Sequence, residues 1–216
     1  MNEYYAKVKR KLSKTVNKIY KVKHTGLENE PVGTPYIVCC NHTSALDVAV
    51  ISVALQSQIH YMAKKEVFKT PILASFAKKM GAIPVDRKSA DVGAIKKAIS
   101  ILKSGECMGV FPQGTRQKKK DPKATPIKDG IGMLASHAGV GILPVCIRTK
   151  NNRLKMHKKT EFIVGEFIPP EDIQFEELTG KKKYQKIAEY AFSKVCELND
   201  RESEYVDGAK KEEENK

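Results

Sequence analysis

The sequence predicts an α/β fold in which a largely parallel central sheet is flanked by helices. Short apolar segments of strand length alternate along the chain with longer segments of helical period, and this alternation is typical of parallel strands joined by helical crossovers. The length of 216 residues suits one such domain with short appendages. Hydrophobic residues at 41% and charged residues at 30% argue against a disordered chain.

The first 24 residues predict an N-terminal amphipathic basic helix. Eight Lys or Arg against one Glu give this segment a net charge of +7, half of the +14 carried by the whole chain. Such a helix can lie in the headgroup region of an anionic bilayer, so residues 1–24 are expected to contact a membrane surface. The other interpretation is a helix that packs its apolar stripe on the domain and keeps its lysines in water. The stripe has spacings of three and four residues and consists of Tyr5, Val8, Leu12, Val16 and Ile19.

Residues 25–200 are predicted to form the α/β domain, and the charged residues 201–216 a disordered tail. Apolar runs rich in β-branched residues and bounded by turn residues predict strands over 36–40, 59–63, 82–85, 107–111, 141–147 and 161–168. Segments with the period of a helix predict helices over 46–56, 66–80 (with a break or start at Pro71), 89–103, 127–138 and 184–198.

The five cysteines show neither a CxxC pair nor the spacing of a zinc site, so buried, reduced thiols are expected. The N-terminal region is polar and rich in lysine, unlike a signal peptide. The longest nearly apolar stretch, residues 48–55, is far shorter than the ~20 residues of a membrane-spanning helix. We therefore expect the protein to be peripheral, at the cytoplasmic face of the cell membrane.

His42 and Asp47 lie where the first central strand ends and a helix begins, which is where α/β folds place ligands. Ser44 and Asp47 have the spacing of a helix cap, which puts Asp47 in the first helical turn. A carboxylate beside an imidazole fixes its tautomer and stabilises the imidazolium. With an unperturbed pKa near ~6.5, histidine suits a general base at neutral pH. The alternative is a structural cap with an incidental histidine.

Two further loops follow predicted strands and contain arginines. Arg87 ends the segment 81–87, and its guanidinium offers donors that match a phosphate. Residues 111–116 contribute Gly114, which permits close approach of the backbone to a ligand, a hydroxyl on Thr115 and a second guanidinium on Arg116. The alternatives are an ion pair between Asp86 and Arg87 and an ordinary polar loop.

A fourth segment, Leu143-Pro144-Val145, is apolar, and its proline predicts an edge strand or a bulge at the wall of a site. The chain has no G-x-S-x-G serine that would serve as a nucleophile. A base without a nucleophile indicates direct attack by a substrate hydroxyl, and two arginines indicate a phosphorylated substrate.

The segments 41–47, 81–87, 111–116 and 143–145 resemble, in order, the four motifs of the glycerolipid acyltransferases. The closest match is the bacterial PlsC type, the 1-acyl-sn-glycerol-3-phosphate acyltransferases. The resemblance covers about residues 25–170 and rests on four motifs in the right order and at roughly the right spacing.

The resemblance implies that His42, oriented by Asp47, deprotonates the free 2-hydroxyl of lysophosphatidic acid. That oxygen would attack the thioester carbonyl of an acyl-ACP or acyl-CoA donor and give phosphatidic acid, with no cofactor and no metal. Arg87 would bind the acceptor phosphate. The remaining predicted substrate-binding residues are Gln113, Gly114, Thr115 and Arg116.

Two residues depart from the family pattern. Gln113 replaces the usual Glu, so it keeps the shape and the hydrogen bonds but loses the charge, and its expected role is positioning. Gln117 stands where Ser is common. A related acyltransferase with glycerol 3-phosphate or another lysolipid as acceptor is the second hypothesis.

A non-enzymatic basic protein that binds membrane or nucleic acid is the third hypothesis. Aromatic residues make up only 7% of the chain, and there is neither a stacking pattern nor a basic recognition helix paired with a turn. A nucleic-acid partner is therefore not expected.

Overall fold

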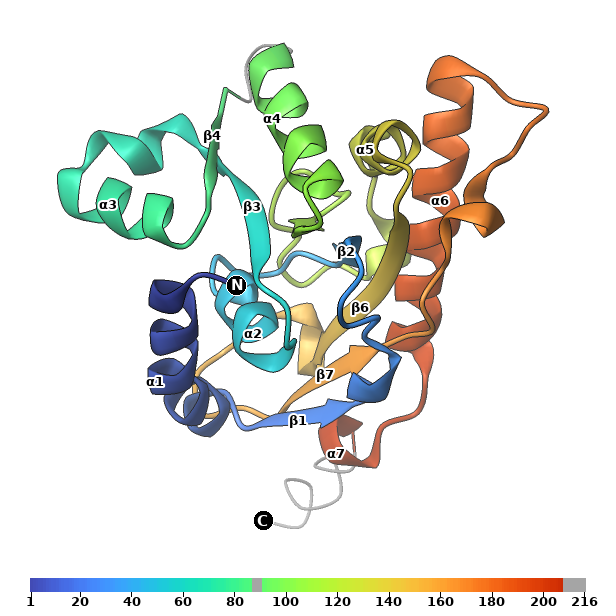
Figure 1. Ribbon diagram of the computed structural model, residues 1–216. Helices are drawn as coiled ribbons and strands as arrows, with labels where there is room; N and C mark the ends of the chain where they lie inside the picture. The colour runs from blue at the N-terminus through green and yellow to red at the C-terminus, as the bar shows by residue number, and fades with distance from the viewer. Residues whose placement is uncertain (87–90, 208–216) are drawn as a thin grey trace.

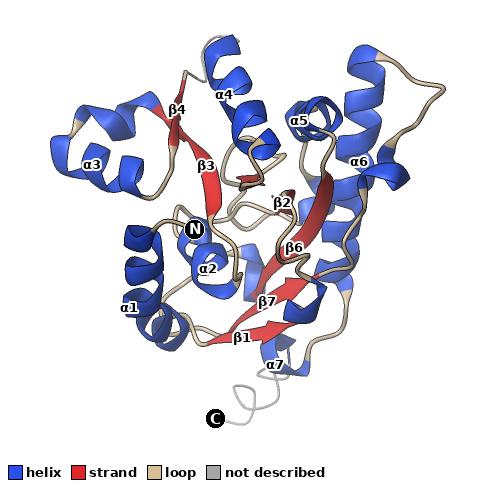
Figure 2. Cartoon of the chain, in the orientation of Figure 1, coloured by secondary structure: helices blue, strands red, loops and turns tan. Residues whose placement is uncertain are grey.

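The computed structural model describes residues 1–86 and 91–207, which form a twisted sheet covered by helices on both faces (Figures 1 and 2). The strand order is β1-β7-β6-β2-β5-β3-β4, and neighbouring strands are parallel except for β6 and β7. The predicted α/β fold with a largely parallel sheet is confirmed. The strands are β1 (Val22–Thr25), β2 (Tyr36–Cys40), β3 (Ile59–Lys64), β4 (Ile83–Val85), β5 (Cys107–Val110), β6 (Gly141–Thr149) and β7 (Thr160–Val164).

Two sets of helices cover the two faces of the sheet (Figure 1). The α-helices are α1 (Glu3–Ile19), α2 (Asp47–Ala54), α3 (Pro71–Lys79), α4 (Val92–Lys103), α5 (Gly130–Ala138), α6 (Gly180–Asp200) and α7 (Glu204–Asp207). Short 3₁₀ helices are η1 (Leu27–Asn29), η2 (Lys65–Lys69), η3 (Pro122–Ala124), η4 (Lys150–Asn152) and η5 (Pro170–Ile173). Helices α4, α5 and α6 pack on one face, and α1 and α2 on the other.

The central strand β2 shows how the sequence builds two cores. Its side chains alternate between faces, as the period of a strand requires. Ile37 and Cys39 point into the core under α4, α5 and α6. Tyr36, Val38 and Cys40 point into the core under α1 and α2. All five residues are buried, which explains why this strand is a continuous apolar run rather than an alternating one.

The N-terminal helix is shorter than predicted, and the domain covers its apolar stripe in part. Helix α1 ends at Ile19, and Val22–Thr25 form the edge strand β1 instead, because they pair with β7 in a contact that a helical period cannot reveal. Tyr5 is fully buried, and Val16 and Ile19 pack against the core on the α2 side. Packing on the domain is therefore seen at both ends of the stripe, whereas Leu12 at its centre is 37% exposed. Contact of residues 1–24 with a membrane surface stays a prediction.

The C-terminal tail begins later than predicted. Residues 201–207 were expected to be disordered, but they fold back on the sheet and include α7. Val206 is buried, Arg148 pairs with Asp207, and the Tyr205 hydroxyl donates to the carbonyl of Lys21 at 2.7 Å. Val206 and Tyr205, which lie among charged residues in the sequence, thus hold this part of the tail on the domain. Residues 208–216 lie outside the described residues.

Pro144 lies on the interior strand β6, not on an edge strand. The predicted bulge is there, however. Val145 pairs with Val164 and Ile142 pairs with Ile168, so two residues of β6 face three residues of the following segment. The ordered pairing of β7 therefore stops at Val164, which shortens the strand predicted over 161–168.

No helix in the described ranges has both the length and the apolar composition to cross a bilayer. All five cysteines are free and buried, as predicted. Burial raises the pKa of each of their thiols, and that of Cys196 rises to about 11. A buried thiol with a raised pKa reacts poorly, because the thiolate is the nucleophile.

We therefore expect a thiol reagent to find almost no reactive cysteine in the native protein at pH 7. Titration with an aromatic disulfide reagent should give fewer than one thiol per chain before unfolding and five in denaturant. Rapid reaction of two or more thiols in the native protein would contradict the burial of these side chains.

Candidate active site

The predicted site residues that the structure describes gather at one edge of the sheet because their motifs follow parallel strands. His42 comes two residues after β2, residues 111–116 follow β5, and Asp86 follows β4. Strands β2, β5, β3 and β4 are adjacent and parallel, so their carboxyl ends lie along the same edge. This is the edge at which open α/β sheets bind ligands.

His42 and Asp47 form a hydrogen-bonded pair. The His42 Nδ1 lies 2.9 Å from the Asp47 Oδ2. Because a carboxylate only accepts hydrogen bonds, Nδ1 has the proton and Nε2 presents its lone pair. The His42 side chain is 13% exposed and Asp47 is fully buried. Nε2 makes no hydrogen bond to any residue that the structure describes, so it is available to a substrate.

The Asp47 carboxylate is held in one orientation by donors from the turn before it. Its Oδ2 also accepts the backbone N–H groups of Thr43 at 2.7 Å and Ser44 at 2.8 Å. Asp47 is the first residue of α2, in the first turn as the capping pattern predicted, and the Ser44 hydroxyl accepts the N–H of Leu46, the residue before the helix, at 3.2 Å. The carboxylate therefore joins the turn after β2 to the start of α2 and fixes the His42 ring at the same time.

Two residues that belong to the predicted motifs, but were given no role, complete the placement of His42. Phe111 stacks on the imidazole, with ring centroids 4.1 Å apart and an interplanar angle of 19°. Asn41, buried next to it, exchanges two hydrogen bonds with the backbone of Ile147, at 2.9 and 3.0 Å. Asn41 thereby ties the end of β2 to β6. The motif segments 41–47 and 111–116 were the available signal for both residues, but neither the hydrogen bonds of Asn41 nor the stacking of Phe111 could be inferred from them.

Gln113 links the second loop to the base. Its Oε1 accepts the His42 backbone N–H at 2.7 Å, and its Nε2 donates to the Thr125 hydroxyl at 2.6 Å. The Gln117 backbone N–H then donates to the His42 carbonyl at 2.7 Å. The loop thus holds the His42 backbone from both sides. An amide can accept at one end and donate at the other, which fits the predicted positioning role.

Two features favour glycine at position 114: a left-handed backbone and the close approach of a neighbouring side chain. The φ of Gly114 is +69°, and a Cβ there would lie 3.1 Å from the Cε of Lys128. The Lys128 stem therefore lies over this loop, and its backbone N–H donates to the Pro112 carbonyl at 2.8 Å. Thr115 and Arg116 are exposed beside it. The fold thus adds the Lys128 ammonium to the predicted cation of Arg116, and sequence spacing gave no indication of it.

Arg87 lies outside the described residues, so its predicted place in the site has no structural description. The residues on either side of it are described. Lys65 lies 3.6 Å from Asp86 and 3.8 Å from Asp91, and Asp91 also caps α4 by accepting the Ala94 N–H. These contacts connect Asp86 and Asp91, the described residues on either side of 87–90, through Lys65.

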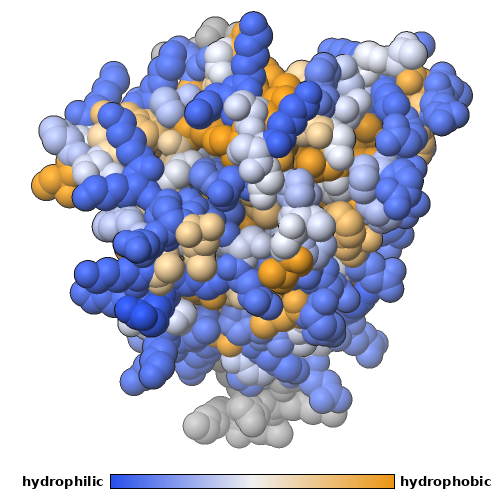
Figure 3. All heavy atoms as spheres, in the orientation of Figure 1, coloured by the Kyte–Doolittle hydropathy of each residue, from blue (hydrophilic) through white to orange (hydrophobic). Residues whose placement is uncertain are grey.

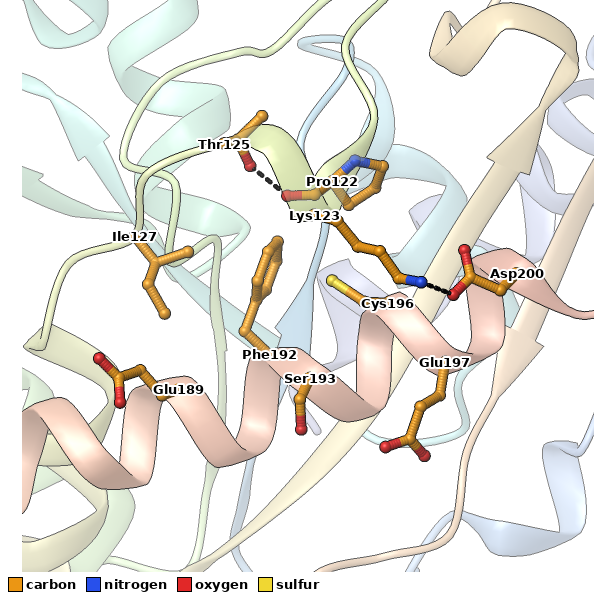
Figure 4. A pocket seen from close by; sticks show the side chains of 10 residues that line it. All are labelled: Pro122, Lys123, Thr125, Ile127, Glu189, Phe192, Ser193, Cys196, Glu197 and Asp200. Carbon is orange, nitrogen blue, oxygen red and sulfur yellow. Dashed lines mark hydrogen bonds and ion pairs between the residues drawn. The ribbon is translucent and has the colours of Figure 1, made fainter.

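A cavity of about 390 Å³ lies behind the Gln113 loop, between residues 122–127 and α6 (Figure 4). Thr125 lines it, and the Thr125 hydroxyl contacts the Pro122 carbonyl (Figure 4). Lys123 reaches across to Asp200 on α6. None of the predicted site residues lines this cavity. Within the described part of the chain, no three His, Cys, Asp or Glu side chains converge as metal ligands would.

Comparison with known proteins connects this geometry to a family. The Acyltransferase family model matches residues 21–148. A 1-acyl-sn-glycerol-3-phosphate acyltransferase of Bacillus subtilis is 33% identical over 183 residues, which are 83% of this chain and 89% of that protein. The Escherichia coli protein of the same name is 26% identical over 76% of this chain and 68% of its own length. The chain spans only 36% of a chloroplast relative from Arabidopsis thaliana.

A solved structure has the same architecture. The crystal structure of the 1-acyl-sn-glycerophosphate acyltransferase PlsC from Thermotoga maritima aligns with a TM-score of 0.67 and 26% identity, over 94% of this chain and 86% of that one.

The hydrogen bonds of Gln113 predict different effects for two substitutions. Gln113→Ala leaves the His42 backbone N–H without its acceptor, which should lower the free energy of unfolding by about 1–3 kcal/mol and reduce turnover. Gln113→Glu keeps that acceptor, and the Thr125 hydroxyl can donate to the new carboxylate, so a smaller loss is expected. Urea unfolding and turnover would be measured for both, with the exposed Gln174→Ala as control. Equal stability of Gln113→Ala and wild type would contradict the positioning role.

Proposed function

The chain belongs to the acyltransferase family and is an acyltransferase of the PlsC type, and on this premise we propose its reaction. It transfers a fatty acyl group from an acyl thioester to the sn-2 hydroxyl of 1-acylglycerol 3-phosphate and releases phosphatidic acid. The names of the relatives support the acceptor. The observation that carries the mechanism is the His42–Asp47 pair, with Nε2 of His42 open at the carboxyl edge of the sheet.

In the proposed step, the Nε2 lone pair of His42 takes the proton of the acceptor 2-hydroxyl as its oxygen attacks the thioester carbonyl carbon. The new C–O bond forms, the C–S bond breaks, and the imidazolium returns the proton to the leaving thiolate. Asp47 holds the ring through Nδ1 and stabilises the imidazolium between these two transfers. No covalent enzyme intermediate is needed.

The acceptor phosphate would lie against the loop that follows β5. Arg116 is exposed there and has no ion pair among the residues of the described ranges, and the Lys128 stem lies over Gly114 beside it. Arg87, which comes two residues after β4 in the sequence, is the second proposed ligand of the phosphate. The uncharged Gln113 places no negative charge near this anion, which favours a phosphorylated acceptor.

The donor is an acyl thioester, either acyl-ACP or acyl-CoA. The acceptor is an amphiphile, so the enzyme would work peripherally at an anionic membrane surface, on the cytoplasmic face. A related reaction on glycerol 3-phosphate or on another lysolipid is the second candidate. The cations Arg116 and Lys128 favour acceptors that carry a phosphate. Rates with lysophosphatidic acid, glycerol 3-phosphate and a lysolipid without a phosphomonoester would separate these possibilities.

Replacement of the base tests the mechanism. His42→Ala should lower kcat by a factor of about 10²–10⁴, the usual contribution of a general base. The fold should persist, because Asp47 keeps the N–H donors of Thr43 and Ser44. Phosphatidic acid formation would be measured in detergent micelles that contain lysophosphatidic acid, with acyl-CoA and acyl-ACP offered separately. The exposed His137→Ala is the control. A fully active, folded His42→Ala enzyme would overturn the assignment.

Removal of the cation tests the acceptor site. Arg116→Gln should raise the KM for lysophosphatidic acid about tenfold or more, since a hydrogen bond to a charged group contributes about 1.5–3 kcal/mol. The KM for the acyl donor should stay the same. Arg201→Gln, an exposed arginine at the end of α6, is the matched control. An unchanged acceptor KM would remove Arg116 from the phosphate site.

A further inference from the structure

Helix α3 presents an apolar face to solvent. Ile72 is 81% exposed, Leu73 52% and Phe76 44%. Ile72 and Phe76 are four residues apart and Leu73 and Phe76 three apart, so all three side chains lie on one side of the helix. Val67 of the preceding η2, against which α3 packs, is also exposed. Figure 1 shows η2 and α3 projecting from the side of the domain, and Figure 3 shows apolar surface there among hydrophilic residues.

The fold does not use this face. Only Ala74 and Ala77 of α3 are buried, and neither belongs to the two cores that cover the sheet. The large apolar side chains point away from the protein. Single exposed apolar residues are ordinary, but several on one helix face indicate an interaction surface.

The surroundings of the apolar face are basic. Between residues 64 and 79 there are five exposed lysines and one acidic residue, Glu66. Lysines beside an apolar face complement an anionic lipid surface, because their stems follow the apolar side chains while the ammonium groups reach the headgroups. The lysines are Lys64, Lys65, Lys69, Lys78 and Lys79.

The segment that carries this apolar face leaves the sheet at the same carboxyl edge as the proposed catalytic residues. Helix η2 begins at the carboxyl end of β3, which is parallel to β5 and β2, and His42 follows β2. At its other end α3 meets the basic helix α1. The Lys79 ammonium lies 5.2 Å from the centre of the Tyr4 ring, and the Asn2 side chain contacts the Lys79 carbonyl at 3.4 Å. Helix α1 packs much of its own stripe against the domain and leaves Leu12 37% exposed, so α3 presents the larger exposed apolar face.

We propose that Ile72, Leu73 and Phe76 of α3 insert into the headgroup region of an anionic bilayer, with the surrounding lysines on its phosphates. This surface deepens the proposed function and rests on it, because it would hold the carboxyl edge of the sheet beside the membrane from which the acceptor comes. The basic helix α1 then adds mainly charge attraction.

The test is binding to vesicles, kept separate from catalysis. Sedimentation with phosphatidylglycerol vesicles would compare wild type with Ile72→Gln/Leu73→Gln, which keeps both the charge and the helix propensity. Burying an aliphatic side chain contributes about 1.5–3 kcal/mol, so the double variant should bind at least tenfold more weakly. Val32→Gln is the control: Val32 is 55% exposed and lies before β2, at the opposite edge of the sheet. High salt and neutral phosphatidylcholine vesicles should weaken wild-type binding.

The outcomes separate the surface from the reaction. In micelles, where no bilayer is needed, the double variant should form phosphatidic acid at the wild-type rate. Equal vesicle binding by wild type and double variant would overturn the proposal and leave the reaction standing. Loss of acyl-carrier-protein binding, or of a dimer, with vesicle binding unchanged would assign the face to that partner instead. A wild type that binds vesicles through α3 but transfers no acyl group would refute the proposed function alone.

Discussion

The active-site geometry depends on one buried carboxylate. Asp47 accepts three N–H groups on a single oxygen, from the His42 ring and from the backbone of Thr43 and Ser44. Because Asp47 also begins α2, the same contacts define the turn that leaves β2 and the direction in which the helix starts. Burying a carboxylate costs little free energy when all its donors are in place, whereas loss of one partner leaves a buried polar group unpaired and destabilises the fold. Local folding and catalytic geometry are therefore one constraint.

The features predicted correctly are those with a local pattern. The apolar run of β2, the spacing of Ser44 and Asp47 and the position of each loop after a strand can each be recognised within a short segment, so sequence alone indicated the sheet and the contact between His42 and Asp47. The features missed depend on contacts distant in sequence. Strand β1 forms because β7 pairs with it, and residues 201–207 fold because Arg148 and Lys21 bind them. Phe111 and Lys128 reach the site in the same way.

The two basic regions of the chain differ in what their apolar residues do. In α1 a regular stripe predicted an amphipathic helix, yet the period of a helix does not say which partner covers the stripe, and here the domain covers much of it. In α3 the sequence predicted a helix, and the structure leaves the large apolar residues Ile72, Leu73 and Phe76 in solvent. Burial is a tertiary property, so composition and period could locate the two helices but could not show which apolar residues each would bury.

The attachment of α3 through two alanines has a consequence for how such a protein can change. Side chains that contribute nothing to the core can vary without loss of stability, so the outer positions of α3 are free to drift or to be selected independently of the sheet. An engineer gains the same freedom. The exposed apolar residues of α3 can be replaced by polar ones to improve yield and crystallisation, or by other apolar ones, without a change in the contacts around Asp47.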